Sequence, residues 1–439
     1  MPAPRASQLS PGATVDVAIE KSVYRGLGLA RHEGQVLFVP RALPGERLRV
    51  RIVSQERGYA RAAVVERLTP SPLERPSPCA FFPRCGGCAY QHLDRSAELR
   101  LKEEILRESL RRGQVAWEAP IEVVPSPETG WRTRATFHAD AGRGGITLGL
   151  YEEGSRRVVN LEGECLQVSA ALNRALGHVR RMLSGRGAAA PRIGDVHLAE
   201  SHDGGEIVVW LDGDLSAAEA QALGTAAARA PWITGFGVTT GPPDGRRRLL
   251  IRGSPYVHVV VAGVRLRSHA AAFFQGNRFL VEPLAREVER LLPGDGPFLD
   301  LYGGVGLFGL TAGRTASEVV IVESSGLAAE DAQANALSAG LGHVRVVTGS
   351  VESALERRPA VPGERVVLDP PRSGAGRRVA EAVAARRPEA VVYVSCDPTT
   401  LARDLRTLGA AGYRVDSLAL FDLFPATMHL ETVARLVPA

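Results

Sequence analysis

The sequence predicts a multidomain protein with a small N-terminal β-barrel, an α+β central domain and a C-terminal α/β domain built on a doubly wound parallel sheet. A chain of 439 residues is too long for one ordinary hydrophobic core. Short β-branched runs separated by glycine turns fill the first 70 residues, and strand and helix patterns alternate from Phe298 onward. We place the domains at 1–70, 71–272 and 273–439.

The overall composition is that of a soluble globular protein, with 45% hydrophobic and 23% charged residues. The first residues lack the apolar segment of a signal peptide, and no apolar run is long enough to span a membrane. We therefore expect a cytoplasmic protein with no membrane partner. No protein partner is implied, and a monomer is compatible with the sequence. Five cysteines are too few for a disulfide framework and suggest metal binding or catalysis.

Positive charge is concentrated at the N-terminus. Residues 1–70 contain eleven Lys or Arg and six Asp or Glu, and this surplus equals the net charge of +5 for the whole chain. In residues 47–53 arginines alternate with apolar residues, which predicts a strand with a basic outer face. A basic module on a neutral body suggests contact with a polyanion. The strands expected in this module are Thr14–Glu20, Gln35–Val39, Glu46–Ser54 and Arg61–Arg67.

A Pro-rich linker at 69–78 separates this module from the central domain. The pattern of residues 96–112 predicts a helix with Ser96 as its cap, and this helix is expected to pack on the catalytic domain. Further on, the strands expected are Arg134–Ala139, Glu206–Leu211, Arg248–Arg252 and Tyr256–Val261, with Ala-rich helices near 170–183 and 216–229.

The C-terminal domain shows regular alternation of strands and helices. The strands expected are Phe298–Leu301, Val319–Val322, Val344–Val347, Arg365–Leu368 and Ala390–Ser395, and the helices lie near 307–314, 326–340, 376–386 and 399–411. Between the first strand and the first helix, segment 300–309 contains GxGxxG, a turn that lets the backbone approach a ligand closely. Glu323 ends the next strand, 19 residues after Gly304, where it can accept hydrogen bonds from a ribose. This pair fits NAD and S-adenosylmethionine equally well.

Two further strands end in groups that carry chemistry. Asp369 is followed by two prolines and Arg372, which places a carboxylate and a rigid turn at the edge of the sheet. The strand at 390–395 is followed by Cys396, Asp397 and a proline. Open α/β sheets bind ligands at the carboxyl ends of their strands, so Cys396 is a candidate nucleophile. The alternative is a buried and inert thiol.

These motifs carry a family resemblance. The Asp-Pro-Pro segment resembles the fourth motif of Rossmann-like class I methyltransferases. Cys396 in Ser-Cys-Asp-Pro, together with the tail 424–431, resembles the uracil-5 RNA methyltransferases. Segment 273–277 resembles the start of that family's catalytic domain, and the N-terminal OB-like barrel resembles the TRAM module of RNA-modifying enzymes. The resemblance covers nearly the whole chain.

The resemblance implies roles for individual residues. Cys396 is expected to be the nucleophile that adds to uracil C6, and Glu431 the base that removes the C5 proton. Asp397 or Asp369 is expected to orient the base or the cofactor. The expected contacts to S-adenosylmethionine are Gln275, Tyr302, Gly304, Glu323, Ser350 and Asp369. Leu307 stands where the family often has a polar residue, so no hydrogen bond to the cofactor is expected from it.

The other four cysteines form a candidate metal site. Cys79, Cys85 and Cys88 are clustered, and Cys165 lies far downstream. Four thiolates can hold a zinc ion or an iron–sulfur cluster, and their spacing does not choose between the two. The resemblance implies a [4Fe-4S] cluster, which is expected to shape the central domain or its RNA surface.

The sequence therefore predicts a methyltransferase that forms 5-methyluridine in RNA with S-adenosylmethionine as methyl donor. We favour 23S rRNA as substrate, because the tRNA-specific bacterial branch generally lacks both the barrel and the cysteine cluster. The alternatives are a tRNA uracil-5-methyltransferase and a non-catalytic iron–sulfur RNA-binding protein. The glycine-rich turn would also fit a dehydrogenase, which is the function we favour least.

Overall fold

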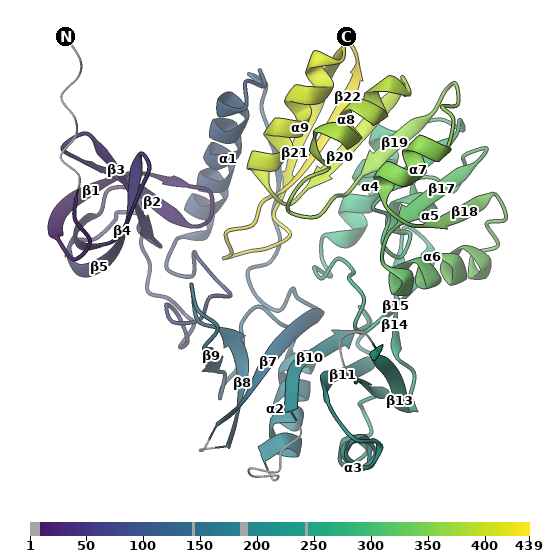
Figure 1. The fold of residues 1–439 in the computed structure, drawn as a ribbon, viewed down its shortest axis with the longest axis horizontal. Helices are drawn as coiled ribbons and strands as arrows, with labels where there is room; N and C mark the ends of the chain where they lie inside the picture. Colours follow the sequence, from purple (N-terminus) through teal and green to yellow (C-terminus); the bar gives the residue numbers. More distant parts are fainter. Residues whose placement is uncertain (1–8, 143–144, 185–191, 242–244) are drawn as a thin grey trace. The chain divides into compact units, whose positions relative to one another are not determined.

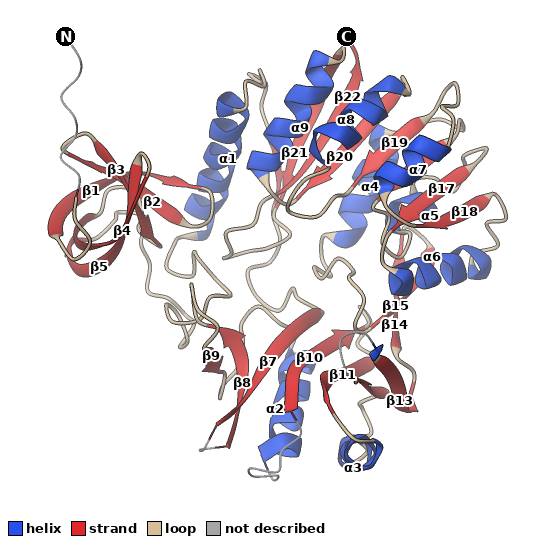
Figure 2. Cartoon of the chain, in the orientation of Figure 1, coloured by secondary structure: helices blue, strands red, loops and turns tan. Residues whose placement is uncertain are grey.

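The computed structural model describes residues 9–142, 145–184, 192–241 and 245–439. Figures 1 and 2 show the course of the chain. It forms two compact units. The first contains the chain up to Ser109 together with Ala426–His429, and the second contains Leu110–Pro425 and Leu430–Ala439. The division into three domains at residues 70 and 272 stays a prediction. Among the described residues, no helix is both long and apolar enough to cross a bilayer.

The first unit contains a closed five-stranded barrel with the strand order β1-β2-β3-β5-β4, so the predicted barrel is confirmed. Its core is built by the alternating inward residues of each strand, such as Val17, Leu37, Leu48 and Val50. One strand was not predicted, because its run is short and begins with a glycine-containing turn. The strands are β1 (Thr14–Val23), β2 (Leu27–His32), β3 (Gln35–Pro40), β4 (Arg47–Glu56) and β5 (Tyr59–Thr69).

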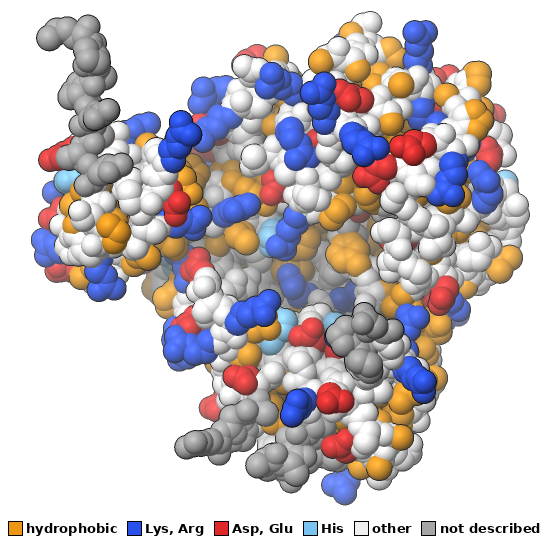
Figure 3. Space-filling view, in the orientation of Figure 1, with side chains coloured by type: hydrophobic (Ala, Val, Ile, Leu, Met, Phe, Trp, Pro, Cys, Tyr) orange, Lys and Arg blue, Asp and Glu red, His pale blue; other side chains and the backbone are white. Residues whose placement is uncertain are grey.

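The outer face of β4 is basic, as the alternation predicts, but local acids neutralise part of its charge. Arg47 and Arg51 are exposed, whereas Arg49 forms ion pairs with Asp16 at 2.8 Å and with Glu66 at 2.7 Å. In Figure 3 the barrel, at the left, shows both blue basic and red acidic side chains. The charge that this surface offers to a polyanion is therefore smaller than the residue count suggests.

Helix α1 (Arg95–Arg112) begins one residue earlier than predicted, and its cap is a different residue. Asp94 Oδ1 accepts hydrogen bonds from the backbone N–H of Ser96 at 2.9 Å and of Ala97 at 3.3 Å. The prediction of Ser96 as the cap was wrong. Asp and Ser are equally good caps, so the choice between neighbours depends on where the chain enters the helix.

In the second unit, a seven-stranded sheet with the order β13-β12-β11-β10-β7-β8-β9 carries the predicted α+β pattern. Two helices pack against its strands, and a separate two-stranded hairpin follows. The elements are β7 (Arg134–Gly142), β8 (Gly145–Tyr151), β9 (Val158–Asn160), α2 (Ala170–Ser184), β10 (Arg192–Glu200), β11 (Ile207–Asp214), α3 (Ala217–Ala227), β12 (Gly235–Thr240), β13 (Arg247–Gly253), β14 (Tyr256–Val261) and β15 (Val264–His269).

The same unit contains an eight-stranded sheet with the order β18-β17-β16-β19-β20-β22-β21-β6. The five strands from β18 to β20 are parallel, and β22 enters antiparallel between β20 and β21. Figure 1 shows α8 and α9 in front of this sheet and α4 behind it. The elements are β6 (Glu122–Val124), α4 (Val281–Leu291), β16 (Phe298–Leu301), α5 (Leu307–Thr311), β17 (Val319–Glu323), α6 (Gly326–Ser338), β18 (Val344–Thr348), α7 (Val351–Arg357), β19 (Arg365–Leu368), α8 (Gly376–Ala385), β20 (Ala390–Ser395), α9 (Pro398–Ala410), β21 (Tyr413–Phe421) and β22 (Glu431–Pro438).

Candidate active site

Cys396 lies in the tight connection between β20 and α9, at the carboxyl edge of the sheet. Every residue of β20 is buried, and Asp397 caps α9 by accepting the N–H groups of Thr399 and Thr400 at 2.9 and 3.0 Å. The pKa of the Cys396 thiol is raised to about 12, mainly by burial and to a smaller extent by the carboxylates of Glu431 and Asp369, while Arg372 opposes the shift. Because Asp397 Oδ1 accepts both of these N–H groups, the Asp397 side chain serves as the cap of α9.

Glu431 is placed beside Cys396 by the register of the sheet. It is the first residue of β22, and the next residue, Thr432, pairs with Ser395 of β20. One step further along this antiparallel register brings Glu431 opposite Cys396. The Glu431 side chain is 2% exposed, and its Oε1 has no hydrogen-bond partner among the residues that the structure describes. Burial raises the pKa of Glu431 well above its ordinary value, and Asp369 adds to this shift.

Asp369 follows β19 and is the third titratable group at this edge. The side-chain amide of Gln275 donates to Asp369 Oδ2 at 3.4 Å. Burial raises the Asp369 pKa to about 7, the hydrogen bond from Gln275 opposes this shift, and the charge of Glu323 reinforces it. The carboxylates of Glu431 and Asp369 therefore disfavour ionisation of Cys396, and the carboxylate of Asp369 disfavours ionisation of Glu431.

The glycine-rich turn between β16 and α5 faces the carboxylate of Glu323. Glu323 accepts the Gly304 N–H at 2.9 Å and the Ser325 N–H at 2.6 Å. Gly304 has a φ of 57°, and a methyl group built on it would meet nothing within 4 Å, so there is open space above the turn. Tyr302 is also left-handed, with a φ of 63°. This is the geometry expected of a nucleoside site.

The structure gives Ser350 a local role that the sequence prediction did not include. Its hydroxyl accepts the Ser353 N–H at 3.2 Å and caps α7. Ser350 is exposed at the end of β18, on the same sheet edge as Glu323. The predicted contact of Ser350 with the cofactor therefore has to share this oxygen with the helix cap. Leu307, the predicted departure from the family pattern, is buried in the core.

Comparisons with known proteins agree with this geometry. Residues 258–437 match the tRNA (Uracil-5-)-methyltransferase family, and residues 8–65 match the TRAM domain. An uncharacterized RNA methyltransferase of Streptomyces coelicolor is 34% identical and covers 98% of this chain and 93% of its own length. The 23S rRNA (uracil(1939)-C(5))-methyltransferase RlmD of Alkalilimnicola ehrlichii is 34% identical over 97% of this chain and 96% of its own length. The chain belongs to the RNA (uracil-5-)-methyltransferase family.

A solved structure supports the fold of this methyltransferase. The tRNA (uracil-54, C5)-methyltransferase of Pyrococcus abyssi, in complex with S-adenosyl-L-homocysteine, has a TM-score of 0.73 at 24% identity. The match covers 96% of this chain and 99% of that one. The two proteins therefore share their fold over nearly the whole length of both chains.

Three cysteines of the methyltransferase lie in the loop that precedes α1. Cys79, Cys85 and Cys88 are half-buried, and N–H groups point at two of their sulfurs. Gly87 N lies 3.4 Å from Cys85 Sγ, and Gln91 Nε2 lies 3.5 Å from Cys88 Sγ. Such donors stabilise thiolates, so the donor set fits a bound metal or cluster.

Cys165 belongs to the second unit and lies just before α2. Its backbone N–H and C=O are both bonded to the Asn173 side chain, at 2.9 and 3.0 Å. These two bonds fix the local conformation of the loop that carries Cys165. The assignment of Cys165 as the fourth ligand stays a prediction.

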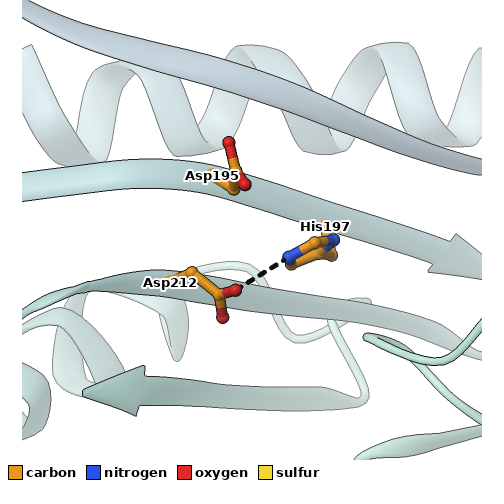
Figure 4. Close-up of side chains that lie close together, drawn as sticks. All are labelled: Asp195, His197 and Asp212. Atoms are coloured by element: carbon orange, nitrogen blue, oxygen red, sulfur yellow. Dashed lines mark hydrogen bonds and ion pairs between the residues drawn. The ribbon is translucent and has the colours of Figure 1, made fainter. Parts of the chain in front are cut away.

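The central sheet of the methyltransferase carries a separate group of side chains that could hold a metal, shown in Figure 4. One donor atom each of Asp195, His197 and Asp212 lies within 4.8 Å of the others. Neighbours already engage these donors, because His197 Nε2 lies 3.3 Å from Asp212 Oδ2 and His138 Nδ1 lies 2.7 Å from Asp195 Oδ1. Thr136 Oγ1 lies 3.0 Å from His197 Nδ1. We interpret this group as a polar network between neighbouring strands.

The sequence prediction omitted residues that hold the site together. Asn277 is 1% exposed, and its side-chain N–H groups donate to Ser126 Oγ and to the Leu423 carbonyl, both at 2.9 Å. Asp300 is fully buried, accepts the Gly309 N–H at 2.8 Å, and has a pKa that burial raises to about 7. Both residues stand inside motifs that were identified, but the partners of Asn277 are more than 140 residues away in sequence.

Proposed function

We propose that this enzyme transfers a methyl group from S-adenosylmethionine to C5 of a uridine in RNA, with 23S rRNA as the favoured substrate. The observation that carries the proposal is the register that brings Glu431 opposite Cys396, while Asp369 acts electrostatically on both. A thiol and a buried carboxyl side by side are what this chemistry needs.

The reaction begins at Cys396. Uracil C5 is too weak a nucleophile to take a methyl group unaided. Addition of the Cys396 thiolate to C6 forms an S–C6 bond and moves the ring's electron pair to C5, which becomes enolate-like. C5 then attacks the methyl group of S-adenosylmethionine, and S-adenosylhomocysteine departs as the leaving group.

Glu431 completes the reaction. The adduct is saturated at C5 and still carries the original C5 proton. The Glu431 carboxylate takes that proton, the C5–C6 double bond forms again, and the S–C6 bond breaks to release Cys396. The Glu431 Oε1 atom, buried and without a described hydrogen-bond partner, is suited to accept it.

The charges of the site favour an order of binding. Burial, followed by the neighbouring carboxylates, raises the pKa of the Cys396 thiol to about 12. S-adenosylmethionine carries a positive sulfonium, and bound beside Asp369 it would lower the pKa of both the thiol and the Glu431 carboxyl. The methyl donor thus promotes formation of the thiolate. The thiolate then activates uracil C5, which accepts the methyl group.

RNA recognition is assigned to the barrel and to an aromatic side chain near the site. C6 cannot be reached within a base stack, so the target uridine has to be flipped out. Phe273 is 72% exposed and lies two residues before Gln275. An exposed aromatic ring there offers a surface on which a neighbouring base can stack.

Cys79, Cys85, Cys88 and Cys165 are proposed to hold a [4Fe-4S] cluster. The N–H groups aimed at Cys85 Sγ and Cys88 Sγ support thiolate ligation. Bound there, the cluster would have a structural role, since methyl transfer requires no redox step. The preference for 23S rRNA rests on the combination of TRAM barrel and cysteines, and tRNA is the alternative substrate.

Trapping with a fluorinated substrate tests the proposal. The enzyme, S-adenosylmethionine and 5-fluorouridine-substituted RNA are combined and run on a denaturing gel. Fluorine at C5 cannot leave as a proton, so the methylated adduct persists as a protein band of reduced mobility. Cys396→Ala should abolish this band. Fragments of 23S rRNA and tRNA loop transcripts are compared in parallel.

A band with rRNA fragments alone supports the favoured substrate, and a band with tRNA alone identifies the alternative. No band with either RNA, in a protein that still binds S-adenosylhomocysteine, would overturn Cys396 as nucleophile and favour a non-catalytic RNA-binding role.

A further inference from the structure

The segment that leads into Glu431 is divided between the two compact units. Residues 422–430 connect β21 to β22. Pro425 and Leu430 belong to the second unit, whereas Ala426–His429 belong to the first. The chain therefore enters and leaves the first unit immediately before the proposed base. Contacts within the first unit determine how this turn is held.

Ala426 is the residue at which the turn is fixed. Its φ is 61°, a left-handed conformation that is costly for a residue with a Cβ. Its N–H donates to Glu98 Oε1 at 2.7 Å, and its C=O accepts the N–H groups of Ala89 and Tyr90, both at 2.9 Å. A strained backbone conformation persists where several surrounding contacts hold it in place, which is often the case at functional sites.

Glu98 supplies a charged acceptor deep inside the first unit. Its side chain is 1% exposed, and it forms ion pairs with Lys102 at 2.7 Å and with Arg95 at 3.0 Å. The Lys102 side chain is fully buried as well. A buried ion pair adds little net stability, because desolvation offsets the attraction. What the pair provides is a carboxylate oxygen held in one place, aimed at the Ala426 N–H.

The second anchor of the turn comes from the cysteine loop and the barrel. Ala89 directly follows Cys88, so the loop with the proposed cluster ligands donates directly to Ala426. Gly26, in the turn between β1 and β2, lies against the same place. A Cβ built on Gly26 would be 2.8 Å from Ala89 Cβ and 3.8 Å from Met428 Cβ.

We propose that Glu98 is a positioning residue for Glu431. Through the Ala426 N–H, it holds the turn from which β22 starts and so sets where the Glu431 carboxylate lies. The inference rests on the proposed function and deepens it. Glu431 acts as a base only after the methyl group has been transferred, so a displaced turn slows the last step most. The enzyme then accumulates as the methylated covalent adduct on natural RNA.

Two double variants isolate the hydrogen bond from the buried charge. Glu98→Gln with Lys102→Met keeps an oxygen that can accept the Ala426 N–H, and Glu98→Met with Lys102→Met removes it. Neither variant leaves the Lys102 charge buried without its partner. We expect the Met/Met variant to lose about 10- to 100-fold in kcat, the range associated with small misplacements of catalytic groups. Its KM for RNA should stay within about twofold, and the Gln/Met variant should recover most of the loss.

Two readouts complete the test. Adduct on unfluorinated RNA is quantified on denaturing gels, with Glu431→Gln as the reference for a stalled last step, and amide hydrogen exchange is measured in peptides covering 422–431. Of the two double variants, we expect adduct and faster exchange in the Met/Met variant and neither in the Gln/Met variant. Equal turnover of the two double variants would overturn it, as would a loss of kcat without adduct. If the wild-type enzyme makes neither product nor adduct, the proposed function fails, but the exchange comparison still decides whether Glu98 holds the turn.

Discussion

Ser395 of β20 and Thr432 of β22 form the last pair of an antiparallel ladder, and the proposed nucleophile and base lie one residue beyond them. Side chains alternate between the two faces of a strand, so a shift of one residue would turn Glu431 to the opposite face. The active site therefore depends on register. Among strands that are otherwise parallel, the antiparallel entry of β22 supplies the base from the last part of the chain.

The first prediction concerns ionisation of Cys396. Because a sulfonium lowers the pKa of a nearby thiol, S-adenosylmethionine should increase the rate of Cys396 alkylation more than S-adenosylhomocysteine does. One pKa unit corresponds to about a tenfold change in thiolate fraction below the pKa. Alkylation by iodoacetamide is followed near pH 8, with the Cys396 peptide quantified by mass spectrometry.

The two ligands have nearly the same shape, so steric protection of the thiol cancels in this comparison. Equal alkylation rates with both ligands would show that the sulfonium does not act on Cys396. The electrostatic order of binding would then be wrong, whereas the assignment of Cys396 as nucleophile would not be affected.

The second prediction concerns Asp300 and stability. Burial raises its pKa from 3.8 to about 7, so the folded protein binds this proton more tightly than the unfolded chain. Stability is then lost as the pH rises from about 4 to about 7. Asp300→Asn keeps an oxygen for the Gly309 N–H and cannot ionise. Relative to wild type, it should gain about 1–3 kcal/mol between pH 5 and pH 8, within the range that a shift of this size allows.

Unfolding in urea at the two pH values measures this difference. Asp295→Asn serves as control, because Asp295 is exposed and precedes the same strand. A wild-type pH dependence that survives unchanged in Asp300→Asn would mean that Asp300 is not the group that titrates.

Local sequence patterns predicted the five parallel strands from β18 to β20, but not β6, β21 and β22 of the same sheet. The bounds of β16, β19 and β20 agree with the expected ones, since each is a short, mostly apolar run that is fully buried. Local patterns do not predict which strands pair with one another. The antiparallel placement of β22 between β20 and β21 depends on contacts across the whole domain, and no local pattern encodes it.

Candidate site residues show the same limit. Motifs identified Cys396 and Glu431, and the register brings them together. Burial of the Glu98–Lys102 ion pair was not predicted, because charged residues at this spacing on a helix usually form an exposed ion pair. Its burial is seen only once Ala426, more than 300 residues away in sequence, is placed against it.

The third prediction concerns Glu323 and the cofactor. Glu323→Gln keeps one acceptor for the Gly304 N–H and loses the charge and the second acceptor oxygen. The dissociation constant for S-adenosylhomocysteine should rise about tenfold, since hydrogen bonds to charged groups contribute about 1.5–3 kcal/mol. Calorimetric titration measures it. Glu330→Gln, an exposed position on α6, is the matched control, and an unchanged affinity in Glu323→Gln would place the ribose elsewhere.

The last prediction concerns the cysteines. Protein purified without oxygen should contain about four iron and four sulfide per chain if the proposed cluster is present. Cys88→Ser and Cys165→Ser should each lose most of both, because a cluster that lacks one thiolate exposes an iron to solvent and exchange. Cys396→Ser removes a thiol outside the set and should retain them. Full iron in Cys165→Ser would exclude that residue as a ligand, and stoichiometric zinc without sulfide in the wild type would replace the cluster by a zinc site.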